Sequence, residues 1–523
     1  MKRSAALAMG VGALLAGAPA GAQEWTSTDP VLQRIWREGM GSGSQVERLA
    51  QALTDSVGPR LTGSPEMANA RQWAVSTYRN WGITAREEQY GTWRGWRRGY
   101  THIDLMQPRM RTLEGTMLAW SPGTRGPVTA QVVLLPEAAD SAAFRAALAG
   151  VRGKYVLISA AQPTCRPDEN WVTWAQPATF ERMKAQRTEM MAAWTRRLQA
   201  TGSTARDLPK RLEEAGAAGI LTNLWSQGWG VDKVFNARTE KIPTLDLSCE
   251  DYGLVFRMAQ NNQSPTLRVD ATSEFMGDVP AANVLAEIRG RQKPNEYVML
   301  SAHFDSWDAG SGATDNATGT VVMMEAMRIL RQVYPNPKRT ILSGHWSGEE
   351  QGLNGSRGFV ADNPRIVEGL QALFNQDNGT GRIAQVSMQG LTGVEPYFRR
   401  WFSRMPGLLV DSVRIDAPGL PSGGGSDNAS FICAGAPGFG LGSLSWDYGT
   451  YTWHTTRDTY DKIAFDEVRR NATMVAMLVY LASEEPEKLP RARLAALPVD
   501  QQGQPRTWPA CQQPARTAAQ STR

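Results

Sequence analysis

The sequence predicts an α/β protein with a mostly parallel central sheet flanked by helices. From Ala281 to Ser483, short and continuously apolar runs alternate with longer segments of helical periodicity. Strands that are apolar along their whole length are buried on both faces, which is typical of parallel sheets with helical crossovers. Between residues 126 and 276 the pattern changes to short β-like runs, which predicts an inserted β-rich module.

The first part of the main domain, residues 23–125, is expected to begin with helices and an early strand. Apolar residues recur at helical spacing from Ser44 to Val57. A turn-rich break follows over Gly58–Glu66. A second helix is expected over Pro65–Gly82, because proline favours the first helical position and glycine the position after the last.

The inserted module is predicted at residues 126–276, an ordinary domain size. A long helical stretch, Ala178–Ala200, and a shorter one, Asp207–Ala217, interrupt its strands. The expected strands lie within Val128–Glu137, Gly153–Ala160, Ala217–Trp225 and Ile242–Ser248.

The second part of the main domain is predicted at residues 277–488. Helices are expected over Asn316–Tyr334, whose methionines we assign to the core, and over Asp466–Ser483. Residues 489–523, rich in Pro, Gln and Arg, are expected to form a tail. The expected strands are Asn295–His303, Arg339–Trp346, Leu370–Asp377 and Gly435–Gly442.

The first 22 residues have the pattern of a secretory signal. Lys2 and Arg3 form a basic tip, an Ala- and Leu-rich stretch follows, and Ala20–Ala22 supplies small residues for signal peptidase. Cleavage after Ala22 lowers the net charge from +5 to +3, because it removes two basic residues and no acidic ones. The apolar run is too short for a membrane anchor. We therefore expect a periplasmic or extracellular protein.

The composition gives no support for nucleic-acid binding. With 20% charged and 41% hydrophobic residues, the chain has the balance of a soluble globular protein, and the signs of charge alternate along it. The one basic aromatic cluster, Trp93–Tyr100, is more simply explained as an exposed strand or loop rim.

Four cysteines allow two disulfides outside the cytosol, with three possible connectivities. Pairing of Cys165 with Cys249 is favoured because both fall in the middle region, which leaves Cys433 to pair with Cys511. Free buried thiols are the alternative.

Histidines and carboxylates follow the ends of several predicted strands. In an open parallel sheet these ends lie along one edge, where ligand sites form. Only four histidines occur in 523 residues, and two of them fall in this set. The residues expected to meet at this edge are His303, Asp305, Asp315, Glu349, Glu350, Asp377 and His454.

Two histidines and three carboxylates suit a pair of divalent ions with one bridging carboxylate. Zinc accepts imidazole nitrogen and carboxylate oxygen and keeps a position open for water. The adjacent Glu349 and Glu350 point in different directions, so one can bind metal while the other moves protons. Asp305 shares a face of extended chain with His303 and can orient its ring.

Each of these patterns also has a simpler explanation. A Glu–Glu pair is usually a solvated helix start, a histidine at a strand end is often structural, and Asn375–Gly379 alone is a turn. Their joint placement at successive strand ends favours the metal site.

The motifs in this order resemble the co-catalytic zinc aminopeptidase family, in particular its plasma glutamate carboxypeptidase-like subgroup. The N-terminal GPRLTGSPEMANARQWA is similar as well, and the middle module resembles a protease-associated domain. The resemblance implies a zinc exopeptidase fold. The motifs are HFDSWDAGSGATDNATG, WSGEEQGLNGSRGF, NQDNGTG, GSDNASF and WHTTRDTYDK.

Carried over to this sequence, the resemblance implies two zinc ions per chain. Asp315 would bridge them, with His303 and Asp377 completing one site and Glu350 and His454 the other. Catalytic roles would fall to two further residues, Glu349 as general base and Asp305 as the support of His303.

The implied activity is that of a secreted or periplasmic zinc metallopeptidase, an exopeptidase that cleaves short peptides through a metal-activated water. Aminopeptidase, dipeptidase and carboxypeptidase action all stay open, and a homodimer is compatible with the resemblance. The alternatives are a single-zinc acyltransferase of the glutaminyl cyclase type and a non-catalytic, receptor-like binding protein. Candidate substrate contacts are Asp427, Trp446, Tyr448 and Tyr451.

Overall fold

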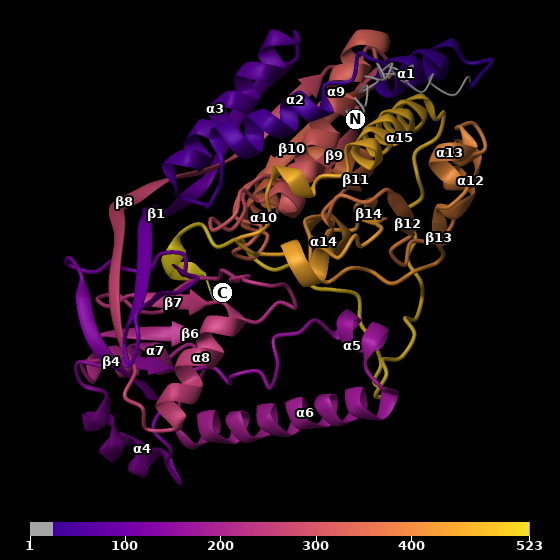
Figure 1. The fold of residues 1–523 in the computed structure, drawn as a ribbon. Helices are drawn as coiled ribbons and strands as arrows, with labels where there is room; N and C mark the ends of the chain where they lie inside the picture. Colours follow the sequence, from indigo (N-terminus) through magenta and orange to yellow (C-terminus); the bar gives the residue numbers. More distant parts are fainter. Residues whose placement is uncertain (1–24, 522–523) are drawn as a thin grey trace, which may run out of the picture.

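The computed structural model describes residues 25–521, and the predicted signal peptide lies outside them (Figure 1). The sheet of the main domain is mixed. Its strands, in spatial order, are β1 (Thr84–Gln107), β8 (Thr266–Ile288), β10 (Arg339–Trp346), β9 (Lys293–His303), β11 (Leu370–Asn375), β14 (Gly438–Ser443), β12 (Ile383–Ser387) and β13 (Arg414–Asp416).

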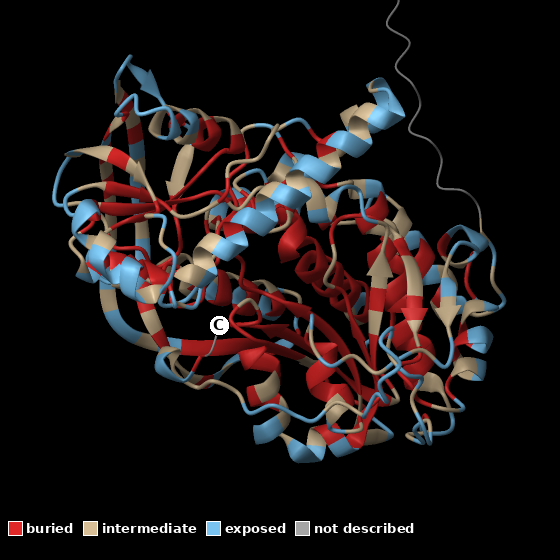
Figure 2. Ribbon diagram, turned by 90° about the horizontal axis from the view of Figure 1, so that it is seen from below, coloured by how far each residue is buried: buried red, intermediate tan, exposed pale blue. Residues whose placement is uncertain are grey.

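The inner strands of this sheet are parallel, as predicted. β10, β9, β11 and β14 pair in parallel with one another in this order, whereas β8 runs antiparallel to β10 and β12 antiparallel to β14. Every residue of β10 and β11 is buried, which explains why their apolar residues do not alternate with exposed polar ones. Figure 2 shows these strands as the buried centre of the molecule.

Helices cover both faces of the sheet. Within β9, Val298 and Leu300 point to one apolar cluster and Met299 to another, because alternate side chains of a strand face opposite sides. The first cluster is closed by α1 (Pro30–Met40), α2 (Val46–Gln51), α3 (Pro65–Asn80), α9 (Thr318–Val333), α12 (Glu395–Phe402), α13 (Gly407–Val410) and α15 (Phe465–Glu484). The second is closed by α10 (Asn354–Asp362), α11 (Pro364–Gly369) and α14 (Asn428–Cys433).

The methionine-rich α9 is a core helix, as the sequence predicts. Met323, Met324 and Met327 have no exposed surface. The helix contacts α15 and α1 as well as β9, so it is enclosed on several sides.

The chain segment that follows β1 and precedes β8 in the sequence, residues 108–265, forms a second body. Its apolar residues form two further clusters, and it carries helices as well as strands (Figure 1). Its elements are β3 (Gly115–Met117), β4 (Val128–Leu134), α4 (Ser141–Ala147), β5 (Tyr155–Leu157), α5 (Asp168–Trp174), α6 (Pro177–Ala200), α7 (Leu208–Glu214), β6 (Gly219–Thr222), β7 (Thr244–Leu247) and α8 (Cys249–Gln260). We call it the insert.

The insert and the main domain share one hydrogen-bonded sheet of 14 strands. The first residues of β8 pair with β4, and its last residues pair with β10, while β1 follows β8 along most of its length. Two long strands therefore connect both bodies.

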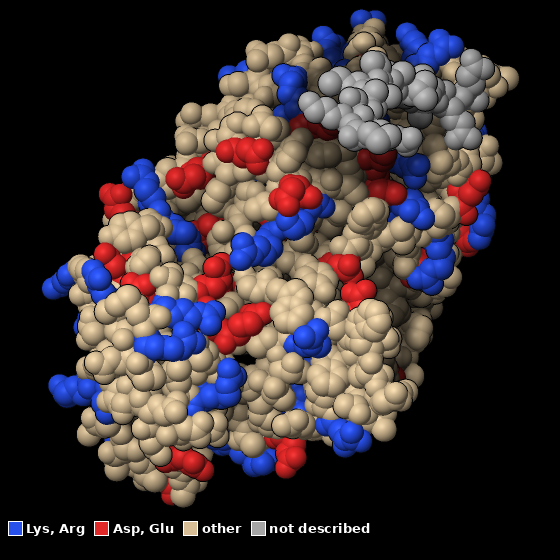
Figure 3. Space-filling view, viewed as in Figure 1, with Lys and Arg blue, Asp and Glu red and all other residues tan. Residues whose placement is uncertain are grey.

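Two disulfides form with the favoured pairing, Cys165–Cys249 in the insert and Cys433–Cys511 between α14 and the tail. The tail follows the surface of the main domain. The Trp508 indole donates to the carbonyl of Ile432, and Arg516 forms an ion pair with Asp362. Among residues 25–521, no helix combines the length and apolar character needed to cross a membrane. Basic and acidic side chains are interspersed on the face shown in Figure 3.

Candidate metal centre

The residues expected at the sheet edge meet around one cavity of about 500 Å³. β9 ends at His303, β10 leads to Glu349 and Glu350, β11 ends before Asp377, and the loop after β14 supplies His454. Asp305 is fully buried directly behind the wall. The cavity is lined by Phe235, Asn236, Arg238, His303, Trp307, Asp315, Glu349, Glu350, Gln351, Asp377, Gly425, Tyr448, Trp453 and His454.

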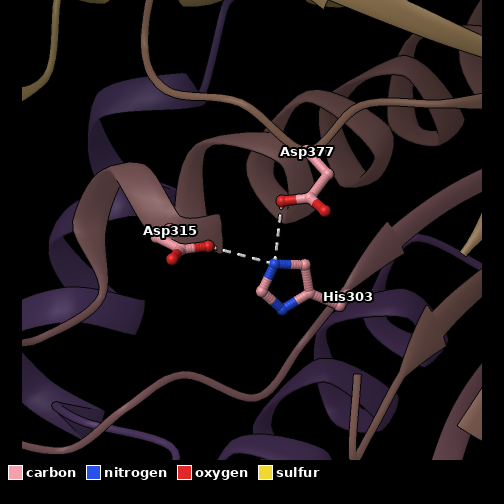
Figure 4. A group of neighbouring side chains, drawn as sticks. All are labelled: His303, Asp315 and Asp377. Carbon is pink, nitrogen blue, oxygen red and sulfur yellow. Dashed lines mark hydrogen bonds and ion pairs between the residues drawn. The ribbon is translucent and has the colours of Figure 1, made fainter. Parts of the chain in front are cut away.

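Two histidine–carboxylate groups share Asp315. His303 Nε2 lies 3.0 Å from Asp377 Oδ1 and 3.2 Å from Asp315 Oδ1 (Figure 4). His454 Nε2 lies 3.0 Å from Glu350 Oε2 and 3.2 Å from the other oxygen, Asp315 Oδ2. Each oxygen of Asp315 therefore faces one histidine.

The Asp315 backbone is held by Asp458. The Asp458 carboxylate accepts hydrogen bonds from the amide groups of Thr314 at 2.7 Å and Asp315 at 3.0 Å. Burial raises the pKa of Asp458 to about 7. The sequence reasoning assigned no role to this residue, although it lies four positions after His454 in the motif WHTTRDTYDK.

Arg60 fixes the loop between β9 and Asp315. Its guanidinium is fully buried, and burial lowers its pKa to about 10, so it stays charged at neutral pH. This role too was missed, although Arg60 stands in the turn-rich GPRLTGSPE. The carbonyls that accept its hydrogen bonds belong to Gly58, Phe304, Ser311 and Gly312.

Asp305 contacts His303 through its backbone and the two glutamates through its carboxylate. Its backbone carbonyl lies 2.9 Å from His303 Nδ1, whereas its carboxylate is 3.8 Å away, too far for a hydrogen bond. The carboxylate instead accepts from the amides of Glu349 at 3.2 Å and Glu350 at 3.3 Å, and from the hydroxyl of Thr62. One residue thus orients the His303 ring and both glutamates.

Two aromatic residues outside the predicted set surround the Glu350–His454 pair. The Trp307 indole donates to Glu350 Oε2 at 2.8 Å. The Phe235 ring packs edge-on against both His454, at 4.9 Å, and Trp307, at 5.6 Å. A donor that fixes a carboxylate beside a metal site raises metal affinity.

The insert also holds the backbone of His454. His454 has φ of +60°, a region that a non-glycine residue enters at a cost of about 1 kcal/mol or more. The amide of Val234 in the insert donates to the His454 carbonyl at 2.8 Å, and Lys233 pairs with Thr455. The position of His454 therefore depends on both bodies.

The electrostatics of the site are dominated by its buried carboxylates. Burial lowers the pKa of His454, but Glu350 and Asp315 outweigh burial and raise it to about 9. Burial also lowers the pKa of His303, and Asp377 with the other neighbouring carboxylates raises it well above its ordinary value. Burial raises the pKa of Glu350 to about 7. The carboxylates that line this cavity, four in number, outnumber its two histidines.

The donor set fits zinc. Nitrogen and oxygen atoms bonded to a tetrahedral zinc at about 2.0–2.1 Å lie about 3.3 Å apart, close to the 3.0–3.2 Å separations seen here. Glu350 Oε1 is buried and has no hydrogen-bond partner within residues 25–521. The two groups able to hold an ion are His303, Asp315 and Asp377, and Asp315, Glu350 and His454.

The four candidate substrate contacts occupy different places. Tyr448 lines the cavity, whereas Asp427 has no exposed surface and lies behind it. Trp446 and Tyr451 line a neighbouring cavity of about 530 Å³, which also reaches Tyr448. Burial raises the pKa of Glu349, and the negative charge of Asp427 raises it further. Burial also raises the pKa of Asp427, to about 8.

The remaining histidines lie apart from the cavity. His345 is buried 2.6 Å from the hydroxyl of Tyr78, and burial lowers its pKa to about 3, which agrees with the structural role expected from the sequence. His102 is exposed on β1 beside Asp104.

Comparison with known proteins identifies this arrangement. The family model described as Peptidase family M28 matches residues 283–479, which contain all five residues of the two groups. This part of the chain is therefore similar to peptidase family M28. The chain carries a metallopeptidase domain of the hydrolase class.

Curated relatives resemble this chain beyond residues 283–479. Carboxypeptidase Q of Mus musculus is 25% identical over 447 residues, which cover 85% of this chain and 87% of the relative. The Homo sapiens carboxypeptidase Q is 25% identical over 454 residues, with coverage of 87% and 88%.

Solved structures share the fold. A peptidase M28 precursor from Shewanella amazonensis has a TM-score of 0.65 and 23% identity, covering 88% of this chain and 97% of its own. A zinc aminopeptidase from Bacillus subtilis has a TM-score of 0.55 and 18% identity, covering 86% and 97%.

Proposed function

We propose that this chain is a two-zinc exopeptidase that hydrolyses short peptides outside the cytoplasm. The observation that carries the proposal is Asp315, whose two oxygens face two separate histidines. A carboxylate shared in this way suits two neighbouring ions. His303 and Asp377 would hold one ion, and Glu350 and His454 the other.

When bound, zinc supplies a Lewis acid for the scissile carbonyl and lowers the pKa of water. The proton transfers fall to Glu349. It lines the cavity beside the ligands, and its amide is tied to Asp305, which positions the side chain next to the reacting atoms. Glu349 would take a proton from the attacking water and give it to the leaving amine.

The similar proteins, carboxypeptidase Q and a zinc aminopeptidase, bear names that describe action at the ends of peptides. This supports exopeptidase action, and we infer the aminopeptidase or dipeptidase type. Two disulfides agree with an oxidising compartment, as does the signal sequence expected at residues 1–22.

The first test joins metal content to activity. The chain from Gln23 is purified, its zinc is counted, and free dipeptides, N-acetylated dipeptides and aminoacyl anilides are assayed with and without chelator. About two zinc ions per chain and chelator-sensitive cleavage of substrates with a free amino end support the proposal. One zinc with acyl transfer would support the cyclase-type alternative, and the absence of both metal and hydrolysis would leave a binding protein.

Glu349→Gln tests the proton transfers. The expected result is a fall in kcat of about 10²- to 10⁴-fold with the zinc content unchanged, because the amide cannot accept the proton. The exposed Glu368→Gln is the matched control. Near-normal activity of Glu349→Gln would refute its assignment as general base.

A further inference from the structure

One segment of the tail lies against the loop that carries the two glutamates of the metal centre. We call this segment, residues 511–521, the strap. It begins at Cys511, which is joined to Cys433 of α14, and it reaches Ser521, whose hydroxyl donates to the backbone carbonyl of Gln351 at 3.4 Å. In Figure 1 the yellow end of the chain lies beside β1. The strap therefore runs from α14 back to the metal centre.

The strap contacts the glutamate loop at two points. Gln351 follows Glu350 directly in the chain, and its backbone carbonyl accepts from Ser521 and, at 3.1 Å, from the side-chain nitrogen of Asn354. The side-chain oxygen of Asn354 accepts in turn from the amide of Ala515 at 2.9 Å. Asn354 is 2% exposed, so water does not compete for these hydrogen bonds. The end of the loop is therefore held by the strap.

Arg516 attaches the strap to β1. Its carbonyl accepts from the amide of Thr92 at 2.8 Å, and its guanidinium donates to the carbonyl of Tyr90 at 2.8 Å and pairs with Asp362. Gly91 lies between these two attachment points. A Cβ atom at Gly91 would lie 2.1 Å from the Arg516 carbonyl oxygen, so the strap can take this path only because residue 91 has no side chain.

The strap also packs against the aromatic residues beside the metal centre. Ala515 and Ala518 lie against the apolar cluster that contains Trp307 and Trp120. The Trp307 indole is the group that donates to Glu350 Oε2. The strap therefore reaches Glu350 by two routes, through the backbone of the next residue and through the cluster that holds the tryptophan.

We propose that the strap positions Glu349 and Glu350, so that this part of the tail is required for metal binding and proton transfer. The Asp305 carboxylate holds the start of the loop through the amides of both glutamates, and the strap holds its end. Partners that orient a metal ligand raise metal affinity, and a fixed general base stays within reach of its proton. The residues of the strap are positioning residues, because they act through the loop. The inference rests on the proposed two-zinc exopeptidase function.

Two variants loosen the strap without changing the cavity wall. Gly91→Ala places a methyl group against the Arg516 carbonyl, and it acts by size alone because Gly91 does not have a positive φ. Arg516→Ala removes the attachment to β1 and Asp362. The control for the first is Gly150→Ala, where a Cβ atom meets nothing within 4 Å. The control for the second is Arg399→Ala, an exposed arginine of α12 that pairs with Glu395.

The first measurement is calorimetric titration of the metal-free variants with zinc, together with dipeptide kinetics. Both strap variants are expected to weaken one of the two zinc binding events by about tenfold, the lower end of the effect of losing a partner that orients a ligand. They should also lower kcat by about tenfold with KM close to that of the parent chain, because the general base acts in the transition state. A strap that serves stability alone would lower the urea midpoint and leave both zinc affinities and kcat unchanged, and that result would overturn the proposal.

Hydrogen exchange separates this inference from the proposed function. The amides of Gly352, Leu353 and Asn354 donate to carbonyls within the glutamate loop, so their exchange reports how often the loop opens. In the metal-free protein, a peptide covering residues 347–357 is expected to exchange about tenfold faster in both strap variants than in both controls, the effect of about one lost hydrogen bond. Faster exchange in a chain that binds no zinc and cleaves no peptide would support the hold of the strap on the loop and reject the exopeptidase. Unchanged exchange in a chain that hydrolyses dipeptides would uphold the exopeptidase and reject the role of the strap.

Discussion

Trp307 is expected to control zinc affinity at one half of the metal centre. Its indole donates at 2.8 Å to Glu350 Oε2, and the side chain is only 7% exposed. The change Trp307→Phe keeps an aromatic ring and deletes this donor. A hydrogen bond to a charged group contributes about 1.5–3 kcal/mol. Loss of such a support lowers metal affinity by about 10- to 100-fold, or roughly 1.4–2.7 kcal/mol, so the two magnitudes agree.

The assay is calorimetric titration of the metal-free protein with zinc. Two binding events are expected in the parent chain, and Trp307→Phe should weaken one of them, because Glu350 and His454 form one group and His303 and Asp377 the other. Trp120→Phe is the matched control. Trp120 packs 6.0 Å from Trp307, and its indole donates to the carbonyl of Arg94, away from the metal centre. Unchanged zinc affinities in Trp307→Phe, or equal losses in both variants, would refute the reasoning.

Two further predictions concern stability. Replacing Cys433 and Cys511 together by serine should lower the free energy of unfolding by about 2–4 kcal/mol, since the disulfide closes a separation of 78 residues; denaturant titration and limited proteolysis of the tail measure this, and an unchanged midpoint would contradict it. Burial lowers the pKa of His345 from its ordinary 6.5 to about 3 in the folded protein, so the folded side chain stays neutral between these pH values. The unfolded chain therefore binds more protons in this window, and stability should fall by about 1.4 kcal/mol per pH unit below pH 6.5. Urea unfolding of the metal-free protein between pH 7 and 5 should show a smaller slope in His345→Leu, and equal slopes would exclude this contribution.

The elements around the metal centre could be predicted because their sequence patterns are local. β10 and β11 are buried along their whole length because both of their faces are covered, and α9 follows the helical period. The His303, Asp315 and Asp377 group follows from strand ends along one edge, a general property of parallel sheets.

The supporting residues were harder to predict because their partners are remote in the chain. Arg60 donates to carbonyls more than 240 positions away, and Asp458 accepts from residues more than 140 positions away. Asp305 was expected to orient the His303 ring, but only the folded loop shows that its backbone carbonyl is the group that lies at His303 Nδ1. Such contacts carry no periodic signal in the sequence.

By itself, the sequence determined which side chains are candidates for the metal site and the main architecture. Residue types, their order along the chain and apolar periodicity can all be read from the sequence residue by residue. Only the tertiary structure shows that residues of the insert line the cavity and hold His454. Val234, Phe235 and Arg238 lie about 220 residues before His454, and nothing local marks them as neighbours of the site. Only the shared sheet through β1 and β8 brings them to the cavity, because strand pairing sets which distant segments meet.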